Sequence, residues 1–152
     1  SVEFSKMKII KIGKNVFQGC KRLKSIKLNS KKINFDDSFI RDCTSLESFD
    51  IESEDNIEIS SSTFIGCNSI KVIRLNTTST IKLSSQISNL STSLETFEIK
   101  GKYIEICENY FKNFSSITSI TIESESNFSF NDGDFDGCES LNYVKFICNN
   151  SL

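Results

Sequence analysis

Histidine, proline and tryptophan are absent from the 152 residues of this chain. Without histidine the chain cannot build a histidine-containing catalytic triad, an imidazole metal ligand or a histidine pH switch. With 20 acidic against 18 basic residues, it also lacks the basic excess that a nucleic-acid-binding surface needs, so we expect no nucleic-acid partner. No apolar run approaches the roughly 18–20 residues of a membrane span, so we expect no membrane insertion. The length is that of one domain with room for a hydrophobic core.

One position recurs along the chain at intervals of 23 or 24 residues. Its occupants are Cys20, Cys43, Cys67, Leu90, Phe114 and Cys138. Three residues before each of them stands a large apolar residue, namely Phe17, Ile40, Phe64, Ile87, Phe111 and Phe135. An apolar pair such as Ile10 and Ile12 precedes this motif, and an apolar trio such as Leu23, Ile26 and Leu28 follows it. Self-similarity at a fixed period of this length indicates a repeat protein.

The apolar pair and the apolar trio each alternate with polar residues, which is typical of half-buried strands. The polar stretch between them, such as residues 13–22, is too short for a full helix and predicts a turn or a 3₁₀ segment. A unit of 23 or 24 residues cannot close a core by itself and must stack on its neighbours. The repeat therefore predicts a solenoid whose equivalent strands pair in parallel, about 4.8 Å apart.

The residues 12–28, IGKNVFQGCKRLKSIKL, resemble a BspA-type (treponemal) leucine-rich repeat. The segments Phe64-Ile65-Gly66-Cys67 and 135–141 carry the same signature, and the resemblance extends from Val2 to Phe146. It implies a curved leucine-rich repeat solenoid of about six repeats, made mainly of short parallel strands with turns or 3₁₀ segments. In that family the trio segments form a concave sheet.

The resemblance also implies a function. BspA-type repeats occur in surface proteins of oral bacteria and parasitic protists, where adhesion to host or matrix proteins is the usual proposed role. It thus implies a non-catalytic protein-binding module, secreted or at the cell surface, with a protein partner of unknown identity. The sequence departs from the family where Leu90 and Phe114 replace the recurring cysteine. Both keep apolar volume there, so we expect the stack to continue unbroken.

The predicted concave sheet carries a row of polar residues, each lying between the last two apolar residues of a trio. The row is Lys27, Asp50, Arg74, Glu98, Thr121 and Lys145. Its charge alternates over the first four members, and we expect these side chains to lie side by side on adjacent strands. Two interpretations are open: a stripe that binds a partner, or a self-neutralising ladder that fixes strand register. Tyr143, in a neighbouring column of mostly small residues, is the aromatic candidate for anchoring a partner.

The six cysteines allow a chemical and a structural interpretation. Those at the recurring position could be metal ligands or disulfide partners, but their spacing is unlike that of a zinc site. We expect reduced thiols packed as small hydrophobic groups, and we expect Cys107 and Cys148, outside the column, to be the more exposed. Asp132, Asp134 and Asp136 superficially resemble a calcium loop but lack the spacing and closing glutamate of an EF-hand. We therefore expect no cofactor, no metal and no enzymatic activity.

Val2 and Phe4 fit the last positions of a preceding repeat, and no polar capping sequence follows the strand around Phe146. We therefore expect one solenoid domain over residues 1–152 that belongs to a longer repeat array, with end strands able to pair end to end. An intracellular scaffold or regulatory module built on the same fold is the alternative function.

Overall fold

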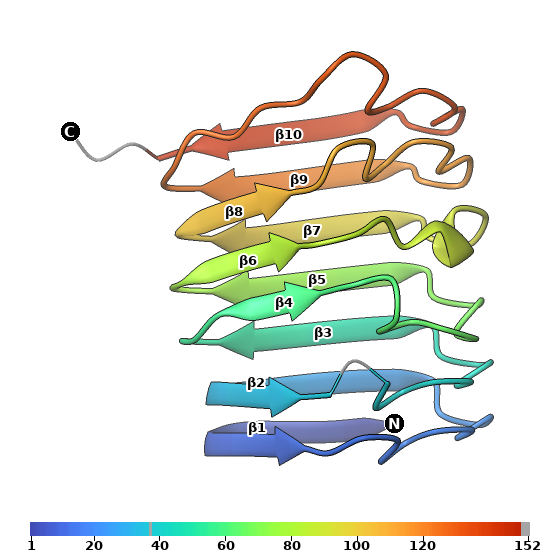
Figure 1. Ribbon diagram of the computed structural model, residues 1–152, viewed down its shortest axis with the longest axis vertical. Helices are drawn as coiled ribbons and strands as arrows, with labels where there is room; N and C mark the ends of the chain where they lie inside the picture. The colour runs from blue at the N-terminus through green and yellow to red at the C-terminus, as the bar shows by residue number, and fades with distance from the viewer. Residues whose placement is uncertain (37, 150–152) are drawn as a thin grey trace.

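The computed structural model describes residues 1–36 and 38–149, which wind into a stack of parallel β-strands (Figure 1). The elements, in chain order, are β1 (Val2–Ile12), β2 (Ser25–Phe35), β3 (Ser48–Ser53), β4 (Ile57–Ile59), β5 (Val72–Thr77), β6 (Thr80–Leu83), the 3₁₀ turn η1 (Ser88–Leu90), β7 (Thr96–Gly101), β8 (Tyr103–Ile106), β9 (Ser119–Ser124) and β10 (Tyr143–Cys148). The described residues contain no α-helix, hence none long and apolar enough to span a membrane.

Two parallel sheets form the walls of the solenoid. The trio segments build a seven-stranded sheet in the order β1-β2-β3-β5-β7-β9-β10, and the pairs build a three-stranded outer sheet in the order β4-β6-β8. One repeat makes one rung of the stack, and the polar stretches turn the chain from one sheet to the other (Figure 1). The solenoid predicted from the repeat is confirmed.

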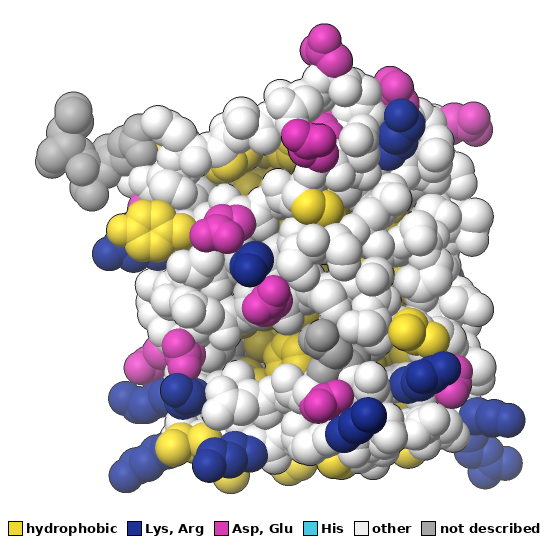
Figure 2. Space-filling view, viewed as in Figure 1, with side chains coloured by type: hydrophobic (Ala, Val, Ile, Leu, Met, Phe, Trp, Pro, Cys, Tyr) yellow, Lys and Arg dark blue, Asp and Glu magenta, His cyan; other side chains and the backbone are white. Residues whose placement is uncertain are grey.

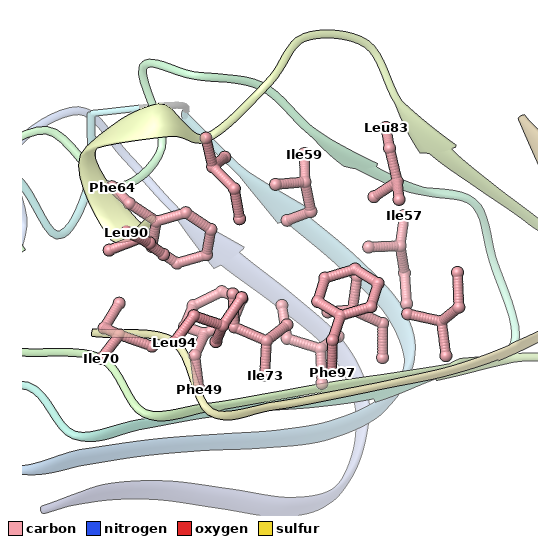
Figure 3. Close-up of a cluster of buried hydrophobic side chains, with 14 of the residues drawn as sticks. Phe49, Ile57, Ile59, Phe64, Ile70, Ile73, Leu83, Leu90, Leu94 and Phe97 are labelled. Atoms are coloured by element: carbon pink, nitrogen blue, oxygen red, sulfur yellow. The ribbon is translucent and has the colours of Figure 1, made fainter. Parts of the chain in front are cut away.

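The core lies between the two sheets and runs through every rung. Figure 3 shows Phe49, Ile73 and Phe97 from the broad sheet meeting Ile59 and Phe64 from the opposite side. The recurring large residue is fully buried in the middle rungs, as at Phe64, and only partly buried at Phe17 and Phe135 near the two ends. Leu90 and Phe114 are also fully buried, so the replacement of cysteine leaves the stack unbroken.

A left-handed backbone position closes the corner before the broad sheet in five of the six repeats; the remaining one has the 3₁₀ turn η1 instead. The residue before the recurring cysteine position has φ between 61° and 76° in five rungs, at Gly19, Asp42, Gly66, Asn113 and Gly137. Glycine, asparagine and aspartate tolerate this conformation best. The geometry lets the amide of one corner donate to the next rung, as from Gly19 to the Arg41 carbonyl at 2.8 Å and from Asp42 to the Ile65 carbonyl at 2.9 Å.

The structure differs from the sequence prediction in two elements. The trio and the following pair were predicted as separate strands, but β1 and β2 run through both, with a register shift between Phe4 and Met7. In β2 the extended conformation continues through the corner from Leu28 to Ile33. The last predicted pair, in 128–130, forms no strand; the rings of Phe128 and Phe130 instead lie against each other, with centroids 5.9 Å apart.

Candidate protein-binding surface

The solvent-facing side of the seven-stranded sheet, called the polar face below, carries the predicted row of charges. In-register pairing sets Lys27 beside Asp50, Asp50 beside Arg74 and Arg74 beside Glu98. Thr121 and Lys145 continue the row on β9 and β10. The structure thus brings all six residues together, as the spacing predicts, because parallel strands of equal repeat length align equivalent residues.

Arg74 is the centre of the row. Its Nε donates to Glu98 Oε2 at 2.8 Å, and its Nη1 lies 3.4 Å from Asp50 Oδ1. Partial burial opposes the charge, but the hydrogen bond to Glu98 and the charges of Glu98 and Asp50 outweigh it and raise the pKa of Arg74. The guanidinium thus bridges carboxylates on the two neighbouring strands and presents a positive group at mid-sheet.

The alternation extends to further columns at the edges of the polar face, which the sequence analysis did not identify. The charged residues of β2 and of the segment just before it are positive, those of β3 are negative, and those of β5 are positive. The ion pairs that join these bands on the polar side are Lys24–Glu47 at 3.5 Å, Lys31–Glu54 at 3.7 Å and Lys71–Glu95 at 3.4 Å. Each pair connects adjacent rungs. The two residues of each pair stand at equivalent positions of adjacent repeats. Alignment of the repeats could therefore have identified these charged columns from the sequence.

Two open grooves lie along the polar face, one on each side of the sheet centre. The first has a volume of about 300 Å³ and is lined by Lys27, Asn29, Asp50 and Glu52 together with the central Arg74. The second, of about 320 Å³, is lined by Glu98, Lys100, Thr121 and Glu123 and again by Arg74. Asn76 borders both. Shallow grooves of this kind suit the surface of a protein partner better than an enclosed small-molecule site.

Tyr143 lies at the β10 end of the polar face, and its residue is 50% exposed. It pairs in register with Ser119 on β9, and Ser119 pairs with Thr96 on β7. These small neighbours leave the aromatic ring standing above the sheet. The structure therefore agrees with its placement beside the charged row, while its role as an anchor stays a prediction.

Replacing Lys27 by alanine should lower the free energy of unfolding by well under 1 kcal/mol. Lys27 is exposed and its pairing with Asp50 is solvent-screened, so the interaction contributes little. Urea denaturation followed by circular dichroism measures this. A loss of 2 kcal/mol or more, roughly that of a buried residue, would contradict the description of the row as a solvated ladder.

The cysteine column is structural. The thiols of Cys43, Cys67 and Cys138 donate to the carbonyls of Phe17, Ile40 and Phe111 in the preceding rung, at 3.1, 3.0 and 3.0 Å. Where Leu90 replaces the cysteine, Asn89 Nδ2 donates to the Phe64 carbonyl instead, at 2.8 Å. The six cysteines, all within the described residues, form no disulfide with one another. In each of these rungs the side chain in this column thus gives a second hydrogen bond to a carbonyl oxygen that accepts only one within its own turn.

The exposure of the thiols differs from the prediction at two positions. Cys148 is exposed as expected, but Cys107 is only partly so, and desolvation by burial raises its pKa. Cys20, a member of the column, is exposed. It lies in the first rung, which among the described residues has a neighbouring rung on one side only.

Thiol reactivity should follow this burial. Desolvation raises the pKa of Cys67 to about 12 and also raises that of Cys43, so almost none of either is thiolate, the reactive form, at pH 8. Alkylation of the native protein at pH 8, read by mass spectrometry, should label Cys20 and Cys148 first. Cys43 and Cys67 should react only after denaturation. Rapid labelling of Cys67 in the native state would show that the column is open.

A second column, of hydroxyl groups, closes the opposite corner of the solenoid. Ser30, Ser53, Thr77 and Ser124 donate to backbone carbonyls of the preceding rung, at 3.0, 3.4, 2.7 and 3.2 Å. They recur with the repeat, so alignment of the sequence could have identified them.

The acidic segment around Asp134 has a structural role. Asp134 is buried, and its two carboxylate oxygens accept the amides of Asn109 and Asn131 at 2.6 Å each. Both carboxylate oxygens are thus used in hydrogen bonds that hold the backbone of the fold. Among residues 1–36 and 38–149 no group of three or more acidic or cysteine side chains is arranged to hold a metal ion.

Comparison with known proteins gives one match. A family model described as the BspA type leucine rich repeat region, with 6 copies, matches residues 1–113 and 82–151. No curated protein and no solved structure is similar enough to count as a match. The two matched ranges together include every strand of both sheets, and they agree with the resemblance seen in residues 12–28.

Proposed function

The chain belongs to the BspA-type leucine-rich repeat family, and on that premise we propose that it is a non-catalytic protein-binding module whose partner docks on the polar face. Repeat solenoids of this kind present extended surfaces for protein recognition. The residues that we propose to contact the partner are Lys27, Asp50, Arg74, Glu98, Thr121, Tyr143 and Lys145.

The observation that carries the proposal is the grooved centre of the polar face, where Arg74 bridges two carboxylates. Arg74 is held by two carboxylates between the grooves, so a partner meets a surface that loses little side-chain entropy on binding. Because the charges already neutralise one another, complementarity of shape and polar hydrogen bonding would provide most of the specificity. Tyr143 supplies the kind of exposed aromatic group that dominates many interfaces.

A pair of tyrosines allows a matched test. Tyr143 lies on the polar face and Tyr103 on the outer sheet, with residue exposures of 50% and 49%. Purified extracellular-matrix proteins, immobilised as a panel, serve as probes in a surface-binding assay. For any member that binds, Tyr143→Ala should weaken affinity about tenfold or more, and Tyr103→Ala should change it less than twofold.

The test has two outcomes against the proposal. Equal losses from both tyrosine variants, or loss only from Tyr103→Ala, would remove the polar face as the binding surface. A second variant, Thr121→Arg, fills the groove lined by Arg74 and Glu98 and should abolish binding without unfolding the sheet. Circular dichroism of each variant shows that the fold is intact.

We also propose that the module acts in adhesion at the cell surface. The family is often surface-associated, and this supports the proposal. Antibodies raised against residues 1–152 should label intact cells. Labelling only after permeabilisation would instead favour the alternative, an intracellular scaffold or regulatory module that uses the same face.

A further inference from the structure

One polar side chain at the middle of the polar face stands outside the pairs that surround it. Asn76 on β5 is exposed, and in-register pairing places it between Glu52 on β3 and Lys100 on β7. Glu52 Oε2 instead accepts a hydrogen bond from Asn29 on its other side, at 2.6 Å. Lys100 pairs with Glu123 at 2.9 Å, also away from β5. The Asn76 carboxamide is thus left with no hydrogen-bond partner among the described residues.

Asn76 also lies where open grooves meet. It borders both of the grooves that flank Arg74. It borders two more, of about 560 and 430 Å³, which extend from the polar face toward the hydroxyl column, one on each side of β5. A group attached to the carboxamide nitrogen would therefore have open space on both sides of the strand.

The three residues Asn76, Thr77 and Thr78 form an Asn-x-Thr sequon, the sequence to which N-linked oligosaccharides are attached. Strand β5 ends at Thr77, and the chain bends at Thr78 and Ser79. Thr78 is exposed, as Asn76 is. The sequon therefore lies on the surface at the end of a strand, where an attached sugar can point into solvent.

The chain contains four more sequons, at Asn89, Asn113, Asn127 and Asn149. Each of these side chains already contacts another part of the fold. Asn89 is half-buried, and its Nδ2 donates to the Phe64 carbonyl at 2.8 Å. Nδ2 of Asn149 donates to Glu123 Oε1 at 3.1 Å. A glycan on either nitrogen would compete with that bond, so the fold singles out Asn76, which the sequon pattern alone does not.

We propose that Asn76 is an N-glycosylation site and that its glycan regulates access to the polar face. Transfer forms a bond between Asn76 Nδ2 and the anomeric carbon of the first sugar. The bond from that carbon to a polyprenyl diphosphate carrier breaks, the diphosphate leaves, and the carboxamide nitrogen loses one proton. An oligosaccharyltransferase of the secretory pathway catalyses the transfer from this lipid-linked donor.

A glycan at Asn76 would cover the centre of the polar face. Asn76 and Arg74 are two residues apart on one strand, a separation of about 7 Å, and both border the same two grooves. An N-linked glycan is bulky and well solvated, so it would keep the surface of a protein partner away from Arg74. Chains with and without the glycan would then be closed and open forms of one module, and this regulatory part rests on the proposed function.

Secretion of the chain from cultured animal cells tests the modification by itself. Peptide N-glycosidase converts a glycosylated asparagine to aspartate, and mass spectrometry of the treated protein should locate this change at Asn76. Thr78→Ser keeps the sequon and should keep the glycan, whereas Thr78→Ala keeps Asn76 but removes the required hydroxyl and should abolish it. An unmodified Asn76 in the wild-type chain, or a glycan on Asn76 in Thr78→Ala, would overturn the assignment.

The two Thr78 variants then test the regulation against the panel of immobilised matrix proteins. For any member that binds Thr78→Ala, the glycosylated Thr78→Ser chain should bind at least about tenfold more weakly. Equal affinities would overturn the regulatory role while the proposed function stands. Binding by neither variant would count against the proposed function and the regulatory role together, and the mass spectra would still decide the modification site.

Circular dichroism of both secreted variants provides the control for folding. Thr78 is exposed, so its replacement by serine or alanine should leave the spectra alike. A difference in binding between two equally folded chains then belongs to the glycan.

Discussion

Replacing Phe64 by alanine should lower the free energy of unfolding by about 3–5 kcal/mol. The Phe64 ring is fully buried, and its centroid lies 5.0 Å from that of Phe49 in a T-shaped contact. Figure 3 shows it between the two sheets, close to Leu90. Removal of the ring leaves a cavity that the surrounding rungs cannot fill, because each is held by its own strand pairing. Urea denaturation monitored by circular dichroism measures the loss.

The neighbouring residue provides the control. Ile65 is 40% exposed, so Ile65→Ala should cost less than 1 kcal/mol, as surface substitutions usually do. Because the stack is held together rung by rung, Phe64→Ala could also split the transition into two steps, one for each half of the solenoid. Equal losses for Phe64→Ala and Ile65→Ala would show that the core does not run through the third rung.

Replacing Gly66 by alanine should cost about 2–4 kcal/mol, from two causes that can be separated. The first is its φ of +76°, which is unfavourable for any residue with a Cβ atom. The second is crowding, because a Cβ atom on Gly66 would lie 2.9 Å from the Cα atom of Asp42 in the rung below. The backbones of adjacent corners approach too closely for a methyl group.

Gly19→Ala isolates the first cause. Gly19 has a φ of +68°, but a Cβ atom there would have no heavy atom within 4 Å, so we expect a loss of only about 1 kcal/mol. The difference between the two variants, measured by the same denaturation, is the cost of crowding. If Gly66→Ala proves no worse than Gly19→Ala, the corners of the stack are more loosely packed than described.

The sequence predicted the stack and the register, because both depend on spacing alone. Once equivalent residues are aligned at 23 or 24 residues, the row from Lys27 to Lys145 must lie on adjacent parallel strands, and the structure places it there. The burial of Leu90 and Phe114 followed from the same alignment. Periodicity carries this information without any knowledge of individual contacts.

Some features that the sequence analysis missed, such as the hydroxyl column, recur with the repeat, but others vary between repeats and have no pattern to reveal them. Phe39 and Tyr110 occupy one repeat position and are buried, but Val16, Thr63 and Gln86 hold that position elsewhere. Because the repeat fixes no residue type there, no pattern marks it as core. The Tyr110 hydroxyl lies in the core without a hydrogen-bond partner, a cost that the tilted contact of its ring with Phe97 and the edge-to-face contact with Phe111 offset. The unbroken paths of β1 and β2 set these strands apart from the other rungs, and the length of the link between trio and pair does not account for them.

The strands lie across the long axis of the stack, and β1 and β10 are at its two ends (Figure 1). Tension applied between these ends would separate the rungs one after another. The hydrogen bonds would therefore break a few at a time rather than all together. Each released rung would add about 80 Å of extended chain, at roughly 3.4 Å per residue. Under a pulling load the molecule should therefore lengthen rung by rung at low force and absorb work gradually before it fails.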